Sequence, residues 1–307
     1  TTGTLTAQAS TSSKTFTGLI TLNGGTMTGN CATLVLGAGL TNTSGTVTLT
    51  GTATLSTLNG AITANAATAI ANLTFNTVAA FTISGSNTLT VSGTLTSTSP
   101  AVVTNTGTVT VTTSIAGTGA FTNDANSTLN YAGTSIVPTL TASANPNTVN
   151  YNGAAQTVKA TATYHHLTLS GSSTKTLTVT TTAINGNLTL SGTATTATVV
   201  GLTIGGNLDV GAGTTFTAAG FALTVTGTTT VTGASSNLVV SNSAGTKIFT
   251  GLVTINTSAV WNNSGNSAIT MRGGLTFNGT TFTAGSGIYT FDTNSQNIGG
   301  SSALTIP

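Results

Sequence analysis

The sequence has almost no charged residues: Lys and Arg total 5, acidic residues total 3, and charged residues make up 3% of its 307 positions. Glu is absent, so the acids are all Asp. A typical soluble domain carries about 25% charged residues. Nucleic-acid binding needs clustered Lys and Arg that neutralise many phosphates, and five scattered cations form no such cluster. The charge inventory therefore excludes a nucleic acid as a partner.

Cysteine is equally scarce. Cys31 is the only one, so no intramolecular disulfide forms, and the near-absence of thiols is typical of proteins outside the cell. We expect Cys31 to be a small buried hydrophobic residue. No apolar run approaches the roughly 18 residues of a membrane-spanning helix. Thr1 is preceded by neither Met nor an apolar signal stretch, so we expect a processed or trimmed piece of a longer protein.

Threonine, by contrast, supplies roughly a quarter of all positions. Alternation with a period of two recurs along the chain, for example in TVTLT at 46–50 and TVTV at 108–111. Thr and Val are β-branched and suit a pleated strand, while Gly, Asn and Ser supply turns. No stretch has the 3.6-residue period of a helix. The pattern predicts an all-β protein.

A short phrase repeats along the chain: INGNLTL at Ile184, IGGNLDV at Ile204 and MRGGLTF at Met271. Its leucines recur every 20 to 24 residues or so, the length of one solenoid coil. We therefore predict a parallel β-solenoid with coils of about 20–24 residues. It forms a single continuous domain over 1–307, with an irregular section at 97–150 that keeps strand character but loses the phrase.

The solenoid makes a specific prediction: Leu188 stacks directly between Leu167 and Leu208 in neighbouring coils. The alternative fold is a string of tandem β-sandwich domains, which also have strands every 8 to 12 residues or so. Sandwich domains centre on bulky aromatics, whereas aromatic residues here are 5% with one Trp, Trp261. The composition favours a thin core of Val, Leu, Ile, Ala and Thr.

Two segments near opposite ends resemble each other. KTFTGLITLN from Lys14 and KIFTGLVTIN from Lys247 are identical at seven of ten positions. Because similar coils present similar strand edges, we expect chains to associate with themselves head to tail, as a homopolymer.

The residues that could carry chemistry are far apart. Asp124, Asp209 and Asp292 are about four coils from one another, roughly 19 Å at the spacing of stacked strands, so no carboxylate pair for glycoside hydrolysis forms. His165 and His166 are neighbours in a strand, so we expect their rings to point to opposite faces, into solvent, and not to share a metal ion. We predict no catalytic, cofactor-binding or metal-binding residues, no cofactor, and no enzymatic activity.

Four asparagines precede or accompany the repeated leucines. Asn72, Asn187, Asn207 and Asn237 are expected to stack at equivalent turns as a side-chain ladder that stabilises the coils.

Two segments resemble phrases that recur in very long secreted and surface β-repeat proteins of bacteria, especially Bacteroidota-like ones. They are TVNYNGAAQTVKATATYHHLTLSGSSTKTL at 148–177 and FTAGSGIYTFDTNSQNIGGSSALTI from Phe282. The resemblance implies an extracellular β-repeat protein of the adhesin or matrix kind and brings no catalytic residues with it.

These observations predict an extracellular or cell-surface structural protein that forms or contributes to a filament, sheath or stalk by end-to-end β-stacking. The alternative is an adhesin or an ice- or glycan-binding solenoid that displays rows of Thr-x-Thr, with surface glycans as possible partners. Thr-rich strands at 46–50 and 228–230 favour such rows. The irregular section at 97–150 argues against a long array.

Overall fold

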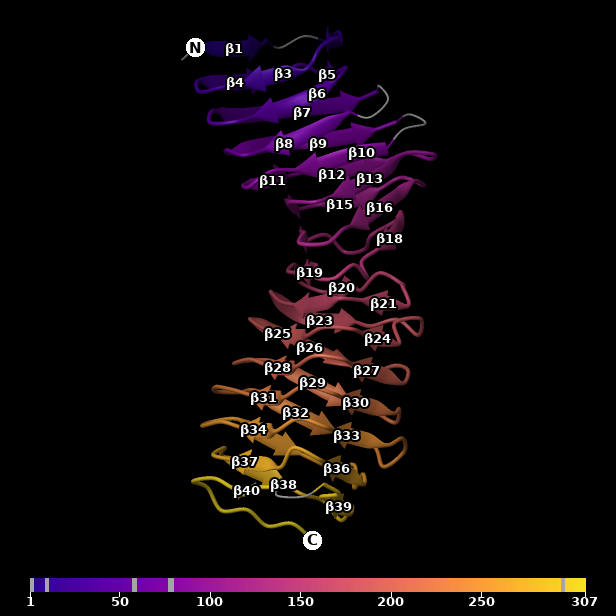
Figure 1. Cartoon of the computed structure of the whole chain (residues 1–307), viewed down its shortest axis with the longest axis vertical. Coiled ribbons are helices and arrows are strands. Elements are labelled where there is room, and N and C mark those ends of the chain that lie inside the picture. Colours follow the sequence, from indigo (N-terminus) through magenta and orange to yellow (C-terminus); the bar gives the residue numbers. More distant parts are fainter. Residues whose placement is uncertain (1–2, 9–10, 57–59, 77–79, 294–295) are drawn as a thin grey trace. The chain divides into compact units, whose positions relative to one another are not determined.

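The computed structural model describes residues 3–8, 11–56, 60–76, 80–293 and 296–307, and the remaining positions of the predicted 1–307 solenoid lie outside the described residues. The chain is an all-β parallel β-solenoid of about 14 coils, as predicted, and the described residues include no helix. It divides into two compact units, Thr1–Val149 and Asn150–Pro307. Figure 1 shows the stacked strands of each unit.

Unit 1 contains three ladders of parallel strands, and each coil contributes a strand to all three except the coil of β17 and β18, which reaches the second ladder only through the bridge of Ile136 with Ile115. The first ladder contains β1 (Thr4–Ala7), β4 (Thr26–Gly29), β7 (Thr46–Leu55), β9 (Thr68–Phe75), β11 (Thr88–Val91), β14 (Thr108–Val111) and β17 (Thr128–Tyr131). The second contains β2 (Lys14–Phe16), β5 (Thr33–Leu36), the later halves of β7 and β9, β12 (Thr94–Ser97) and β15 (Ser114–Ala116). The third contains β3 (Ile20–Leu22), β6 (Gly39–Asn42), β8 (Ala61–Ala64), β10 (Ala80–Ser84), β13 (Val102–Asn105), β16 (Ala120–Asn123) and β18 (Thr139–Thr141).

Unit 2 repeats this plan with shorter strands. Its first ladder contains β19 (Thr148–Tyr151), which spans the boundary between the units, β22 (His166–Leu169), β25 (Leu188–Leu190), β28 (Leu208–Val210), β31 (Thr229–Val231), β34 (Val253–Ile255), β37 (Leu275–Phe277) and β40 (Ile298–Gly299). The second contains β20 (Gln156–Thr157), β23 (Ser172–Thr176), β26 (Thr193–Ala197), β29 (Thr215–Ala218), β32 (Asn237–Val240), β35 (Val260–Asn262) and β38 (Thr281–Thr283). The third contains β21 (Thr163–Tyr164), β24 (Ala183–Ile184), β27 (Leu202–Ile204), β30 (Leu223–Val225), β33 (Lys247–Phe249), β36 (Ile269–Met271) and β39 (Tyr289–Thr290).

The register places like residues on like residues. Leu167 pairs with Leu188, and Leu188 pairs with Leu208, in parallel strands of successive coils, which confirms the predicted stacking. All three leucines are fully buried. Because side chains alternate across a strand, each coil presents its leucines inward and its threonines outward.

The section at 97–150 keeps the same architecture although it lacks the repeated phrase. Val103 of β13 pairs with Phe121 of β16, which pairs in turn with Leu140 of β18, and all three are buried. Each coil must place an apolar residue at the inward position of the ladder, and Val, Phe and Leu all fill that position, so the repeated phrase itself is not required.

The core contains most of the aromatic residues beside the expected Val, Leu, Ile and Ala. The largest fully buried side chains are led by Trp261, Tyr131, Tyr151 and Tyr164. Polar tips are bonded: the Tyr131 hydroxyl donates to the carbonyl of Ser135 at 2.6 Å. Aromatic side chains bury large areas, so a few of them fill the coil interior. Cys31 is buried, as predicted.

Two of the five cations point into the core. Lys175 is fully buried, and its Nζ donates to the carbonyls of Gly153 and Ala154 at 2.6 and 2.5 Å and to Oε1 of Gln156 at 2.8 Å. Lys247 is also buried and donates to two turn carbonyls. Burial lowers the pKa of Lys175 to about 8. These lysines join turns within the solenoid and carry little surface charge.

The two matching segments are buried to different degrees. In β2, Lys14 is exposed and Phe16 is half-buried, whereas in β33 both Lys247 and Phe249 are buried. In register, however, Lys14 and Phe16 pair with the buried Leu34 and Leu36 of β5, so these two positions face inward in both segments and only the burial differs.

Candidate binding face

The three aspartates have separate environments. Asp124 lies in a turn, where its Oδ1 accepts a hydrogen bond from the N–H of Ala125. Asp209 faces outward from β28, and burial raises its pKa. Asp292 pairs with Nε of Arg272 at 3.2 Å. Within the described residues, no three His, Cys, Asp or Glu side chains are close enough to hold a metal ion.

The two histidines do not behave as predicted. His165 lies at a bend between β21 and β22, is only 9% exposed, and its ring meets that of His166 edge to face at 4.3 Å. Strict alternation applies within a strand, and the bend at His165 breaks it, so the two rings turn toward each other. Burial, with His165 alongside, lowers the pKa of His166.

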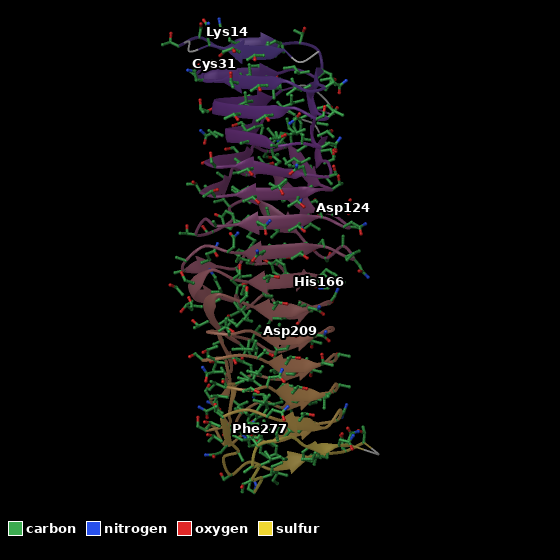
Figure 2. All side chains as sticks on the ribbon, turned by 90° about the vertical axis from the view of Figure 1, so that its left-hand side faces the viewer. Lys14, Cys31, Asp124, His166, Asp209 and Phe277 are labelled. Atoms are coloured by element: carbon green, nitrogen blue, oxygen red, sulfur yellow. The ribbon has the colours of Figure 1, made fainter. Side chains whose placement is uncertain are left out.

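His166 begins a side-chain ladder along one corner of unit 2. Its Nδ1 accepts the N–H of Asn187 at 2.9 Å, Oδ1 of Asn187 accepts the N–H of Asn207 at 2.9 Å, and Oδ1 of Asn207 accepts the N–H of Thr228 at 3.0 Å. Figure 2 marks His166 on its ladder strand. The predicted asparagine ladder therefore exists, although it runs from side chain to backbone.

The other two asparagines of that prediction differ. Asn72 in unit 1 makes the same contact, accepting the N–H of Thr94 at 2.9 Å. Asn237 belongs to no such ladder: its Nδ2 donates to the carbonyl of Ser235 at 3.1 Å and to Oγ1 of Thr215, its partner on β29, at 3.5 Å. A buried ladder that the sequence did not predict links Asn105 to Asn123 at 2.8 Å.

The most regular surface of unit 1 is the outward side of its first ladder, which we call the threonine face. It consists of Thr4 and Thr6 on β1, Thr26 and Thr28 on β4, Thr46 and Thr48 on β7, Thr88 and Thr90 on β11, Thr108 and Thr110 on β14, and Thr128 on β17. The outward residue Ala69 of β9 pairs with Thr48 on one side and Thr90 on the other, so one coil lacks the hydroxyls.

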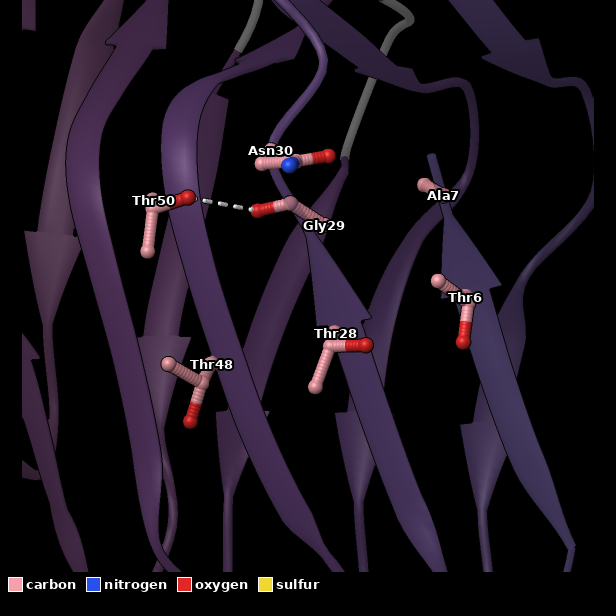
Figure 3. Close-up of a pocket in the computed structure, with 7 residues that line it drawn as sticks. All are labelled: Thr6, Ala7, Thr28, Gly29, Asn30, Thr48 and Thr50. Atoms are coloured by element: carbon pink, nitrogen blue, oxygen red, sulfur yellow. Dashed lines mark hydrogen bonds between the residues drawn. The ribbon is translucent and has the colours of Figure 1, made fainter. Parts of the chain in front are cut away.

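Threonines of the face lie directly above one another. Thr6 pairs with Thr28, and Thr28 pairs with Thr48, so their side chains form a row across three coils. Figure 3 shows this row, with Thr50 donating its hydroxyl to the Gly29 carbonyl at 3.1 Å. A depression of about 220 Å³ follows the row. The face is thus a two-dimensional array of hydroxyls and methyls.

The array continues into the section at 97–150, where the sequence argued against it. Thr88 pairs with Thr108 and Thr108 with Thr128 in unbroken register. The first ladder keeps its register although the repeated phrase is lost, because the differences in spacing lie in the turns and in the other two ladders. The sequence does contain a signal that predicts this array. A Thr-x-Thr motif recurs every 20 to 22 residues, and one coil has Ala67 and Ala69 in place of its two threonines.

Unit 2 has a narrower row. Thr168, Thr189, Asp209 and Thr230 follow one another on the outward side of its first ladder. Its strands are three residues long there, which leaves one outward position per coil and a carboxylate in the row. The two-dimensional array is therefore a property of unit 1.

The part of the chain that the structure describes has no helix long and apolar enough to cross a lipid bilayer. In comparisons with protein-family models, curated proteins and solved structures, nothing matches this chain.

Proposed function

We propose that this chain is an extracellular structural protein that contributes to a filament, sheath or surface stalk by end-to-end β-stacking. A β-solenoid suits a structural or adhesin-like role, because stacked coils make a rigid element without needing a catalytic site. The scarcity of thiols supports a location outside the cell.

The observation that carries the proposal is the like-on-like register of the coils. Leu188 has a leucine on each side, and Thr28 has a threonine on each side. A coil that accepts such a neighbour within one chain offers the same backbone groups and side-chain rows to a coil of another copy. A contact of this head-to-tail kind does not close, and therefore produces a filament.

The charge distribution supports association. Lys175 and Lys247 are buried, and Arg272 is paired with Asp292. Few charges then remain at the surface to repel another copy, and little of the contact depends on ion pairing. Assembly is expected to persist at high salt.

The test uses the whole chain in sedimentation and negative-stain electron microscopy at rising protein concentration and at two salt concentrations. Phe282 of β38 stacks on Trp261 with ring centroids 5.8 Å apart and is half-exposed, so Phe282→Lys places a charge on that coil surface. Thr254→Lys, outward on β34, adds the same charge to a side face. Filaments that Phe282→Lys abolishes and Thr254→Lys preserves support the proposal. A chain that stays monomeric throughout contradicts it.

We also propose that the chain is not an enzyme, on the separation of its acids. Asp209 lies in a threonine row, and Asp292 is engaged by Arg272. Glycoside hydrolysis needs two carboxylates about 5 to 9.5 Å apart. Turnover of a polysaccharide that disappears in Asp209→Asn would overturn this proposal.

A binding module, either an adhesin or an ice- or glycan-binding solenoid, is the second candidate, and the threonine face favours it. The face presents a repeating surface without charge, on a backbone held by ladder hydrogen bonds at every level.

A further inference from the structure

We propose that the threonine face of unit 1 binds the surface of crystalline ice. This inference rests on the binding-module candidate and names its ligand. It depends on three features of the face: the spacing of its hydroxyls, their lack of protein partners, and their rigidity.

The spacing follows from strand geometry. Neighbouring strands are about 4.8 Å apart, so Thr6, Thr28 and Thr48 repeat at that interval across the coils. Hydrogen-bonded water oxygens are about 2.75 Å apart, and tetrahedral geometry then places second neighbours about 4.5 Å apart. A row of threonines therefore matches a row of alternate oxygens in an ordered water lattice to within a few tenths of an ångström.

The hydroxyls are available for a ligand. Within the described residues, the hydroxyls of Thr26, Thr28, Thr46 and Thr48 make no hydrogen bond to another protein group. Thr46 and Thr48 are exposed. Water or a surface that imitates water must satisfy these groups, and an ordered lattice satisfies many of them at once.

The side chains are already ordered before binding. Threonine is stiff at χ1, and each strand of the face is held by neighbours in the ladder. Ordering a rotamer-rich side chain on binding costs conformational entropy, and short β-branched residues avoid most of that cost. A weak contact repeated over many threonines can therefore accumulate.

The composition of the face favours ice over a polysaccharide. Apart from the amide of Asn130 on β17, which pairs with Thr110, its described positions carry only hydroxyls and methyls. They lack the aromatic rings that supply large apolar contact areas and the carboxylates that bind sugar hydroxyls bidentately. Methyl groups beside hydroxyls suit a lattice of water, which presents both oxygens and open cavities. The face carries no charged side chain, so no ionic group orders the neighbouring water around itself in a way that differs from ice.

The experiment grows polycrystalline ice slowly from a dilute solution of the whole chain and measures the fraction of protein incorporated. Thr28→Tyr combined with Thr48→Tyr raises two bulky side chains from the centre of the face. The matched control is Thr104→Tyr, outward and half-exposed on β13 of the same unit. Thermal unfolding of each variant checks that the coils remain folded.

Incorporation of the parent and of Thr104→Tyr, with loss in the double variant, supports the inference. Exclusion of the parent from ice overturns it. A second arm sediments the parent with microcrystalline cellulose: binding there without incorporation into ice overturns the ice proposal but leaves the binding-module function standing. Binding to neither overturns the ice proposal and also counts against a cellulose-like glycan as the ligand, and the filament assay still decides the structural function separately.

Discussion

Nδ1 of His166 accepts a hydrogen bond from the backbone N–H of Asn187 on the following coil, at 2.9 Å. In the next step of the ladder, Oδ1 of Asn187 fills the same role for Asn207. A titratable ring therefore occupies a position where a neutral amide serves in the following coil, and this one contact becomes sensitive to pH.

We predict that acid weakens unit 2 through His166. Burial lowers the pKa of His166, so the unfolded chain takes up this proton at a higher pH than the folded chain. The stability is thus present above the ordinary value of about 6.5 and is lost as pH falls below it. Protonation also replaces the acceptor with a donor, a loss of about 1 kcal/mol. Urea unfolding at pH 7.5 and 5 measures the difference.

The control is His166→Asn, which keeps a side-chain acceptor for the N–H of Asn187 and removes the titration. This variant is expected to lose most of the acid sensitivity, with His165 still present. An unchanged pH dependence would show that the ladder contact does not carry the effect.

A second pH dependence, of the same sign but at higher pH, is expected from Lys175. Burial lowers its pKa to about 8, while the unfolded side chain titrates at about 10.4. Between pH 8 and 10 the unfolded chain binds more protons than the folded chain, so the free energy of unfolding rises with pH, by about 1–2 kcal/mol. Burial raises the pKa of Tyr164, which reverses the trend above about pH 10.

Unfolding of the parent and of Lys175→Met across this window measures the effect. Lys175→Met is expected to flatten most of the rise, and Lys247 accounts for the remainder because burial lowers its pKa as well. The same slope in both proteins would mean that Lys175 keeps its proton when folded.

The leucine stack makes a direct prediction about packing. Leu188→Ala leaves a cavity between Leu167 and Leu208 and is expected to lower the free energy of unfolding by about 2–5 kcal/mol. Thr189→Ala, on the outward side of the same strand, is expected to change it by about 0.5 kcal/mol or less. Equal losses in the two variants would contradict the inward and outward assignment.

Whether a turn requires glycine can be tested in unit 2 by comparing two Gly→Ala variants, at Gly192 and at Gly201. Gly192 has φ +68°, and a Cβ there would lie 2.2 Å from the carbonyl oxygen of Gly171 on the preceding coil. Gly192→Ala is therefore expected to cost roughly 1–3 kcal/mol or more. At Gly201 the nearest atoms would be 3.9 Å away, so Gly201→Ala is expected to be close to neutral. Differential scanning calorimetry of the two variants distinguishes the positions.

The fold class and the core register of unit 2 could be predicted from the residues alone. Alternation with a period of two decides which side chains face inward, and the recurrence of leucine sets the length of a coil, so the stacking of Leu167, Leu188 and Leu208 was predictable. Both signals can be read directly from the sequence: the alternation from a few adjacent residues, and the coil length from the constant interval between leucines.

Which outward residues align and which polar groups are buried depends on contacts between coils, and these exist only in the folded chain. Turns of different lengths absorb the irregular spacing, so the alignment of Thr88, Thr108 and Thr128 is visible only once the ladders are formed. The burial of Lys175 likewise depends on the carbonyls of Gly153 and Ala154 in the preceding coil. Such partners lie about 20 residues away in sequence, beyond the reach of any local pattern.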